Sequence, residues 1–183
     1  GAASRPVRSN WLWWKLDDAP AADHLLDDVL EKRTPMPWFS EADTDRLLTL
    51  MSPPSLERLR VARKAGRTVV GTIYKRGRPD VDGNVRQRAE LRTDGLAGCL
   101  RTPAGGSSRQ ILLFIKGNRT RARLVSSREV ARLMGLPDSY RMPDTYNNAY
   151  RVAGDGVAVP VVRYLDQVLF APILARRSLE AVA

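Results

Sequence analysis

Two kinds of pattern divide the chain, and their order limits the folds that it can adopt. Apolar residues recur every three or four positions in the first third and again towards the C-terminus, which is typical of helices. Short apolar segments separated by glycine and serine fill the centre, which indicates strands. We therefore expect an α+β fold in which helices lie at both ends of a β-rich centre.

Three helices are expected before residue 67. The first lies within 23–32, the second is capped by Ser40, and the third follows the prolines of 53–54 and ends at Gly66. Their buried faces are expected to contain Leu25, Leu26, Val29 and Leu30; Leu47, Leu48 and Met51; and Leu56, Leu59 and Val61.

The central region reads as a small, irregular β unit across residues 68–124. The segment 68–74, TVVGTIY, predicts a strand, and the polar segment 75–84 predicts a loop that begins with three basic residues. Further short strands are expected at 88–93, 98–102, 111–116 and 120–125.

The segment LVSSREVARLMGLPDSY, residues 124–140, predicts a short helix with clear ends. Ser126 and Glu129 have the spacing of a capping box, in which each side chain accepts a backbone N–H of the other residue. Val130, Leu133 and Met134 would form one buried stripe, and Gly135 ends the helix. A last helix is expected from Pro160 to Pro172. Its apolar face would hold Val161, Val162, Leu165, Val168 and Leu169.

The net charge of +10 is concentrated in one part of the chain. Residues 56–133 contain 19 basic and 6 acidic side chains, a net charge of +13. This block favours a polyanionic partner, and its many arginines suit forked contacts to phosphate and guanine. A solvated basic surface remains the alternative from charge alone.

Several kinds of chemistry are not supported. The chain has one cysteine, Cys99, and one histidine, His24, which allows neither a disulfide framework nor an ordinary zinc site, and no Ser-His-Asp set. We expect Cys99 to be a small buried residue. No run of eighteen apolar residues occurs, so no membrane span and a cytoplasmic location are expected. The tryptophan cluster at 11–14 is expected to be a core plug or an interface anchor.

Three segments resemble conserved parts of DNA (cytosine-5) methyltransferases, in the family's order. RLVSSREVARLMGLPDSY, residues 123–140, resembles the ninth conserved motif of that family. AYRVAGDGVAVPVVRYL, residues 149–165, is similar to the tenth motif, with Asp155 and Gly156 where the family usually has Asn and a small Ala or Ser. GLAGCLRTPAGGSSRQ, residues 95–110, resembles the target-recognition segment, with Cys99-Leu100 before the loop Gly105-Gly106.

The motifs for the cysteine nucleophile and for most of the methyl-donor site have no counterpart in the chain. The resemblance thus implies the target-recognition domain and last two motifs of such an enzyme, inactive alone, with double-stranded DNA and a separate catalytic domain or subunit as partners. It implies a tail at 1–10, a target-recognition domain at 11–124 (helical 11–66, β-rich 67–124) and C-terminal motifs at 125–183. The family's cofactor is S-adenosylmethionine, which Asp155 and Gly156 would border.

DNA contacts are expected from the segment around the Gly-Gly loop and from the basic start of the loop at 75. The expected residues are Arg101, Thr102, Gly105, Gly106, Arg109, Gln110, Lys75, Arg76 and Arg78. Arginine to guanine and glutamine to adenine are plausible base contacts. A stand-alone basic DNA-binding module and a protein-interaction domain remain alternative hypotheses. The recognised base sequence, and any pairing with a restriction enzyme, stay open.

Overall fold

The computed structural model describes residues 15–20, 25–80, 82–102 and 109–180. The chain forms two compact units, and each is described by itself. One comprises residues 22–158, and the other combines 1–21 with 159–183. The expected tryptophan cluster and His24 lie outside the described residues.

In the part of the chain that the structure describes, three helices precede the sheet: α2 (Leu26–Val29), α3 (Glu41–Thr49) and α4 (Pro53–Arg63). Ser40 caps α3, as predicted, by accepting a hydrogen bond from the N–H of Asp43 at 3.0 Å. The predicted first helix is shorter than expected because Leu30 already has an extended backbone. On α4, only Leu59 of the three predicted apolar residues is buried; Leu56 and Val61 face solvent.

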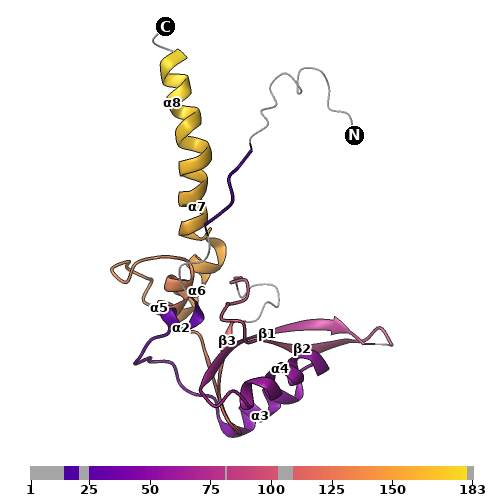
Figure 1. Cartoon of the computed structure of the whole chain (residues 1–183). Coiled ribbons are helices and arrows are strands. Elements are labelled where there is room, and N and C mark those ends of the chain that lie inside the picture. Colours follow the sequence, from indigo (N-terminus) through magenta and orange to yellow (C-terminus); the bar gives the residue numbers. More distant parts are fainter. Residues whose placement is uncertain (1–14, 21–24, 81, 103–108, 181–183) are drawn as a thin grey trace. The chain divides into compact units, whose positions relative to one another are not determined.

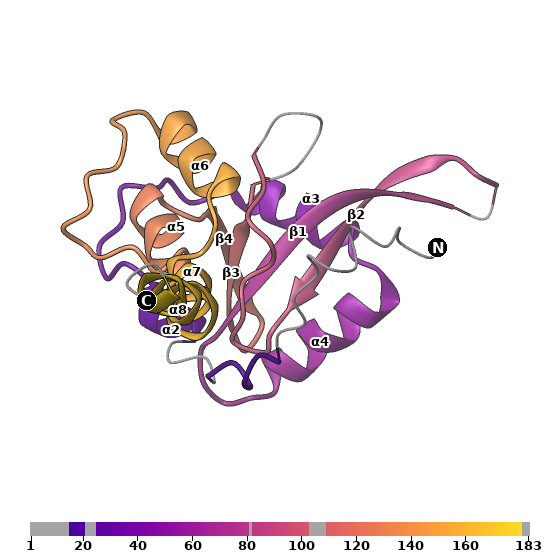
Figure 2. The same ribbon diagram turned by 90° about the horizontal axis from the view of Figure 1, so that it is seen from above.

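Four antiparallel strands form one sheet in the order β2-β1-β3-β4 (Figures 1 and 2). The strands are β1 (Val69–Pro79), β2 (Val85–Arg92), β3 (Ile111–Lys116) and β4 (Arg119–Leu124). The strand predicted at 98–102 is absent, since residues 98–102 have no regular structure. The predicted loop 75–84 is also wrong in part, because β1 continues through Lys75 to Pro79.

The β1–β2 hairpin is longer than the rest of the sheet. β3 pairs with β1 only along 69–73, whereas β2 pairs with β1 along 72–79. The part of the hairpin beyond Ile73 is therefore a two-stranded ribbon, which Figure 2 shows extending past the end of β3. Pro79 is tolerated at the end of β1 because no strand pairs with that side of the ribbon.

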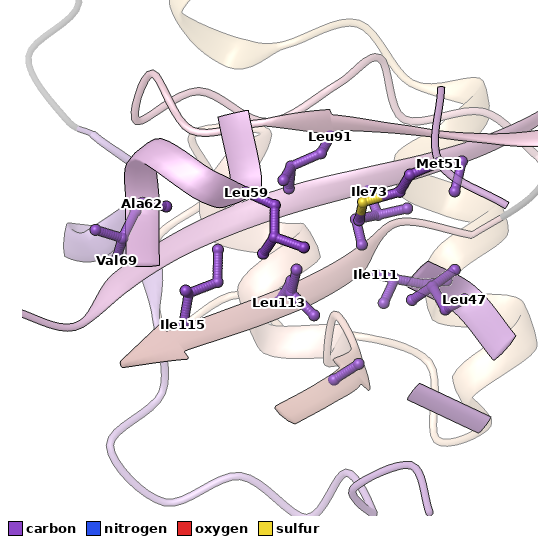
Figure 3. Packing of buried hydrophobic residues seen from close by; sticks show 12 residues of the cluster. Leu47, Met51, Leu59, Ala62, Val69, Ile73, Leu91, Ile111, Leu113 and Ile115 are labelled. Atoms are coloured by element: carbon purple, nitrogen blue, oxygen red, sulfur yellow. The ribbon is translucent and has the colours of Figure 1, made fainter. Parts of the chain in front are cut away.

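The sheet is covered on both faces along the inner strand β3, so residues 111–115 of this strand are all apolar. Ile111, Leu113 and Ile115 of β3 pack with α3 and α4 in one core cluster (Figure 3). Leu112 and Phe114, which point the other way, pack against a second cluster formed by α2, α5 and α6. This arrangement leaves the two-stranded ribbon as the part of the sheet that extends beyond β3.

Helix α5 (Ser127–Leu133) has the predicted capping box. Ser126 Oγ accepts from the N–H of Glu129 at 3.1 Å, and Glu129 accepts from the N–H of Ser126 at 2.8 Å. Val130 is buried, whereas Leu133 and Met134 are only partly buried. Arg132 donates to both carboxylate oxygens of Asp138 at 2.7 and 2.8 Å and so ties the helix to the turn that follows it.

Helix α6 (Tyr146–Asp155) was not predicted from the sequence. Thr145 caps its start by accepting from the N–H of Asn148. Ala149, Tyr150 and Ala153 are buried on one side of it. Gly154 and Asp155 thus belong to the last turn of a helix.

The second unit contains α7 (Val159–Leu165), a π-helical turn η2 (Asp166–Phe170) and α8 (Ala171–Glu180). The prediction that Pro172 ends the helix is wrong, because α8 continues beyond it. Pro172 has no N–H and its ring conflicts with the carbonyl of Val168, which accounts for the wider turn before it. Tyr164 Oη donates to the backbone carbonyl of Asp17. None of α7 or η2 is buried.

By length and composition alone, one helical stretch of the described residues, Tyr146–Ala175, could cross a membrane; an 18-residue window within it has a mean hydropathy of 1.5. The absence of a span was expected from the lack of a continuous apolar run, a stricter condition than mean hydropathy. A single stretch of this kind is weak evidence, since core helices meet the same condition.

Candidate nucleic-acid interface

One face of the β1–β2 ribbon is lined with arginines. Side chains two apart on a strand share a face, and the register places Arg76 opposite Arg88 and Arg78 opposite Arg86. Like charges directly opposite each other on a sheet destabilise it. Two such pairs in succession are therefore a cost to the fold that a bound anion would remove.

Carboxylates offset only part of this charge. Glu90 lies 3.2 Å from both Arg76 Nε and Arg78 Nη2, and Asp80 lies 2.7 Å from Arg86 Nε. Arg88 has no hydrogen-bond or ion-pair partner among the described residues. Four arginines thus face two carboxylates, and the ribbon face keeps a positive charge.

A cleft of about 600 Å³ lies beside the same face, where segment 98–101 passes the strands. It is lined by Thr72, Tyr74, Lys75, Arg76, Gly77, Glu90, Arg92, Gly98, Cys99, Arg101 and Gln110. The Arg76 guanidinium lies 4.9 Å from the centre of the Tyr74 ring. Cys99 is exposed, which corrects the prediction of a buried residue. The lining carries four basic side chains and one acidic one.

Gln110 has a different position from the one expected of a base-reading residue. The residue is fully buried, and its backbone N–H donates to Tyr150 Oη at 2.9 Å. Its amide nitrogen and oxygen have no hydrogen-bond partner among the described residues and pack against Gly98. The side chain therefore has no exposed surface from which to contact a base edge in a groove.

The other predicted DNA-binding residues of this segment have distinct surroundings. Arg101 is exposed and has no polar partner among the described residues. Thr102 Oγ1 donates to Asp155 Oδ1. Arg109 donates to Asn147 Oδ1 at 2.5 Å, and its guanidinium lies 5.5 Å from the centre of the Tyr146 ring. Gly105 and Gly106 lie outside the described residues.

Asp155 and Gly156, the expected cofactor residues, lie at the C-terminal end of α6. The Asp155 carboxylate already accepts a hydrogen bond from Thr102, and the Gly156 N–H donates to the carbonyl of Val152 at 3.1 Å. These two residues do not by themselves form a site that fits S-adenosylmethionine.

Sequence reasoning missed part of the basic face. Arg86, Arg88 and Arg92 share the face of Arg76 and Arg78, but the short run 86–88 is too brief to indicate binding by itself. The signal was the alternation of arginines in VRQRAELR, residues 85–92, which has the period of a strand.

Comparison with known proteins finds relatives that are methyltransferases. A segment of 47 residues is 51% identical to DNA (cytosine-5)-methyltransferase CMT2 of Oryza sativa subsp. japonica, covering 26% of this chain and 4% of that protein. Another of 50 residues is 40% identical to Type II methyltransferase M.BsuFI of Bacillus subtilis, covering 27% of this chain and 12% of that protein. The chain thus aligns with only a small part of either relative. No solved structure matches significantly.

The family comparison covers much more of the chain than these two alignments do. The model of the C-5 cytosine-specific DNA methylases matches residues 40–171, which include the sheet, α5, α6 and α7. With well over half of its length matched, the chain belongs to the C-5 cytosine-specific DNA methylase family.

Proposed function

We propose that this chain is the DNA-recognition and C-terminal portion of a DNA (cytosine-5) methyltransferase. The complete enzyme would transfer a methyl group from S-adenosylmethionine to C5 of cytosine in duplex DNA. Membership of the family supports the reaction, and the order of the three resembling segments supports the assignment to a C-terminal portion. The cysteine nucleophile and most of the donor site would belong to a separate catalytic portion, so this chain alone would be inactive.

The arginine face of the β1–β2 ribbon is the single observation that carries the DNA-binding role. Cross-strand arginines at two successive positions repel one another, and phosphates between them would relieve that repulsion. A two-stranded β-ribbon also fits the major groove of B-DNA, which is about 12 Å wide. Arg76, Arg78 and Lys75, all predicted as DNA contacts, lie on this ribbon.

Arg101 would add an interaction from the neighbouring segment. It is exposed and lines the same cleft as Arg76 and Arg92. DNA lying along the ribbon would therefore meet basic side chains from β1, β2 and segment 98–101. A DNA partner also agrees with a cytoplasmic, nucleoid-associated location, which stays an expectation.

The salt dependence of DNA binding tests this role. For B-DNA, the slope of log affinity against log salt concentration changes by about 0.9 for each phosphate that a basic side chain neutralises. The double substitution Arg76→Gln/Arg88→Gln should therefore make the slope shallower by about 2 and weaken binding at low salt. Fluorescence anisotropy with a labelled duplex of mixed sequence measures both.

The matched control is Arg46→Gln/Arg60→Gln, which removes the same charge from α3 and α4 on the other face of the sheet. It should leave the slope unchanged. Equal effects of the two double substitutions would show that the basic block acts only through net charge, and a flat salt dependence of the wild-type chain would contradict DNA binding altogether. Salt-sensitive DNA binding without any catalytic partner encoded nearby would favour the stand-alone binding module.

A further inference from the structure

Residues 101–102 and 109–110, which flank residues 103–108 in the sequence, are attached to helix α6 at several points. Arg109 bonds Asn147, the Gln110 N–H bonds Tyr150, and Gly154 contacts the backbone of residues 101–102. On a helix, positions 147, 150 and 154 fall at i, i+3 and i+7, which is one stripe along the surface. The chain is therefore attached to a single face of one helix both before residue 103 and after residue 108.

The contact at the C-terminal end of α6 is between main chains. A Cβ atom on Gly154 would lie 2.6 Å from the backbone nitrogen of Thr102 and 2.9 Å from the carbonyl carbon of Arg101. Real side chains do not make such contacts with backbone atoms, so only glycine permits this approach. The approach fixes the backbone of Arg101 against a helix whose buried side, including Tyr150, belongs to the core.

Asp155 completes this attachment by accepting the hydroxyl hydrogen bond of Thr102. A hydrogen bond between a hydroxyl and a carboxylate at the protein surface adds little to the stability of the fold. Its main effect is therefore to fix the position of Thr102. The residue next to Thr102 is Arg101, which is exposed at the cleft beside the basic ribbon.

We propose that α6 positions the DNA-contacting segment, with Gly154 and Asp155 acting as positioning residues for Arg101 through Thr102. The expected effect on DNA affinity rests on the proposed DNA-binding function, whereas the attachment itself can be tested without DNA. Asp155 thereby has a role in this chain that its place in the tenth motif did not suggest. Arg101 is presented to DNA in a fixed direction because its neighbour is held at the end of a core helix.

Cys99 is the chain's one cysteine, is exposed, and lies three residues before Thr102, so it reports on this attachment. Its rate of reaction with a thiol reagent measures how freely segment 98–102 moves. Thr102→Val removes the hydroxyl at nearly constant shape, whereas Thr102→Ser keeps it. Thr102→Val should raise the rate by about two- to tenfold, the range that one net hydrogen bond supports, and Thr102→Ser should restore the wild-type rate.

Gly154→Ala gives a second, independent variant, because its methyl group would displace the backbone of residues 101–102. It should raise the Cys99 rate even with Thr102 and Asp155 intact. In the DNA-binding assay, Thr102→Val and Gly154→Ala should each lower affinity to about the level of Arg101→Ala, and should have little further effect in an Arg101→Ala background.

Two results would overturn the proposal. Equal Cys99 rates in the wild-type chain, Thr102→Val and Gly154→Ala would show that segment 98–102 is held by other contacts. Additive losses of affinity in the Arg101→Ala background would show that the attachment does not act through Arg101. If no variant binds DNA, the proposed function fails, while the Cys99 rates still decide whether α6 holds the segment.

Discussion

At the scale of single residues, a buried ion pair is central to the fold around α5. Arg123 donates to the two carboxylate oxygens of Glu129 at 2.6 and 2.7 Å, and the two side chains are 2% and 1% exposed. The guanidinium also lies near the rings of Trp38 and Phe114, 5.7 and 5.3 Å from their centres. Losing one member of such a pair leaves the other charge buried and unpaired, which costs about 3–5 kcal/mol.

Glu129 has more partners than the capping box predicts. Besides Ser126 and Arg123, it accepts a hydrogen bond from the N–H of Glu31 at 3.0 Å, so it joins β4, α5 and the segment after α2. The spacing of Ser126 and Glu129 was enough to predict the cap. The partnership with Arg123 was not predictable, because Arg123 stands in a basic block and reads as one more surface arginine.

Glu129 should make the stability of the chain sensitive to acid. Burial alone raises the pKa of this carboxyl, but the hydrogen bonds from Arg123, Ser126 and Glu31 outweigh it and hold the pKa below the ordinary value of 4.5. A pKa that is lower in the folded state adds stability above the unfolded pKa, and this stability is lost as the pH falls towards the folded pKa. The free energy of unfolding should therefore fall as the pH drops below about 4.5.

Glu129→Gln is the matched variant for this prediction, since it keeps the shape and removes the titrating group. It should be less stable at neutral pH by about 3–5 kcal/mol, because Arg123 is left buried without a countercharge. Its stability should also change less than that of the wild type between pH 6 and pH 3.5. Urea denaturation followed by circular dichroism at both pH values gives the comparison, and parallel pH profiles would contradict the role of Glu129.

At the scale of elements, the predictions succeeded where the signal is local. Ser40 caps a helix, the box at Ser126 opens α5, and ILLFIK forms β3 at the predicted residues 111–116. Each depends on a few neighbouring residues and on hydrogen bonds within one turn, or on a run that is apolar on both faces.

The misses came where distant contacts decide the structure. Residues 98–102 were predicted to form a strand, but residues 101–102 lie against α6, where Gly154 permits the close contact. Gln110 looks polar and available, yet Tyr150 and Gly98 enclose it. No pattern within these short segments contains that information, because Tyr150 lies 40 residues from Gln110 and Asp155 lies 53 residues from Thr102.

The π-helical turn before α8 leads to a prediction for Pro172. The N–H of Ala171 donates to the carbonyl of Asp166, five residues back, instead of to residue 167. The substitution Pro172→Ala supplies the backbone N–H that proline lacks and removes the steric conflict, so residues 166–171 should return to ordinary α-helix. Backbone chemical shifts should show regular helix there, and amide exchange across the turn should slow. The control Pro160→Ala lies in the first turn of α7, where proline is tolerated, and should leave the turn unchanged.

At the scale of the whole molecule, the helical segment 159–180 has an unusually apolar surface. Large apolar side chains are exposed along it: Val161, Val162, Phe170 and Leu174 are 49%, 49%, 48% and 62% exposed. The predicted face of this helix contains Val161 and Val162, and Leu165, Val168 and Leu169 are only partly buried. A run of exposed apolar residues on this scale is typical of a surface that binds another protein, a ligand or a membrane.

The composition of the chain could not reveal what covers this segment, but the proposed function supplies a candidate. The relatives are longer proteins, and the aligned part covers only 4% and 12% of them. Under the proposed function, the catalytic portion of the methyltransferase is the partner that this chain requires. Each fully buried valine or leucine side chain would contribute about 1.5–3 kcal/mol to such an interface.

Adding a catalytic portion of this kind in trans should therefore slow amide exchange in residues 159–172 and, if the two parts fit, produce methyl transfer that neither part shows alone. Hydrogen exchange of the chain with and without the catalytic portion measures the first effect, and transfer of a labelled methyl group to duplex DNA measures the second. Val162→Asp should abolish both effects by placing a charge on the covered surface, whereas Arg163→Gln, beside it on α7, should preserve them. Methyl transfer by this chain alone would disprove the division of the enzyme, and equally strong protection of residues 159–172 with and without the catalytic portion would show that the segment is not a docking surface.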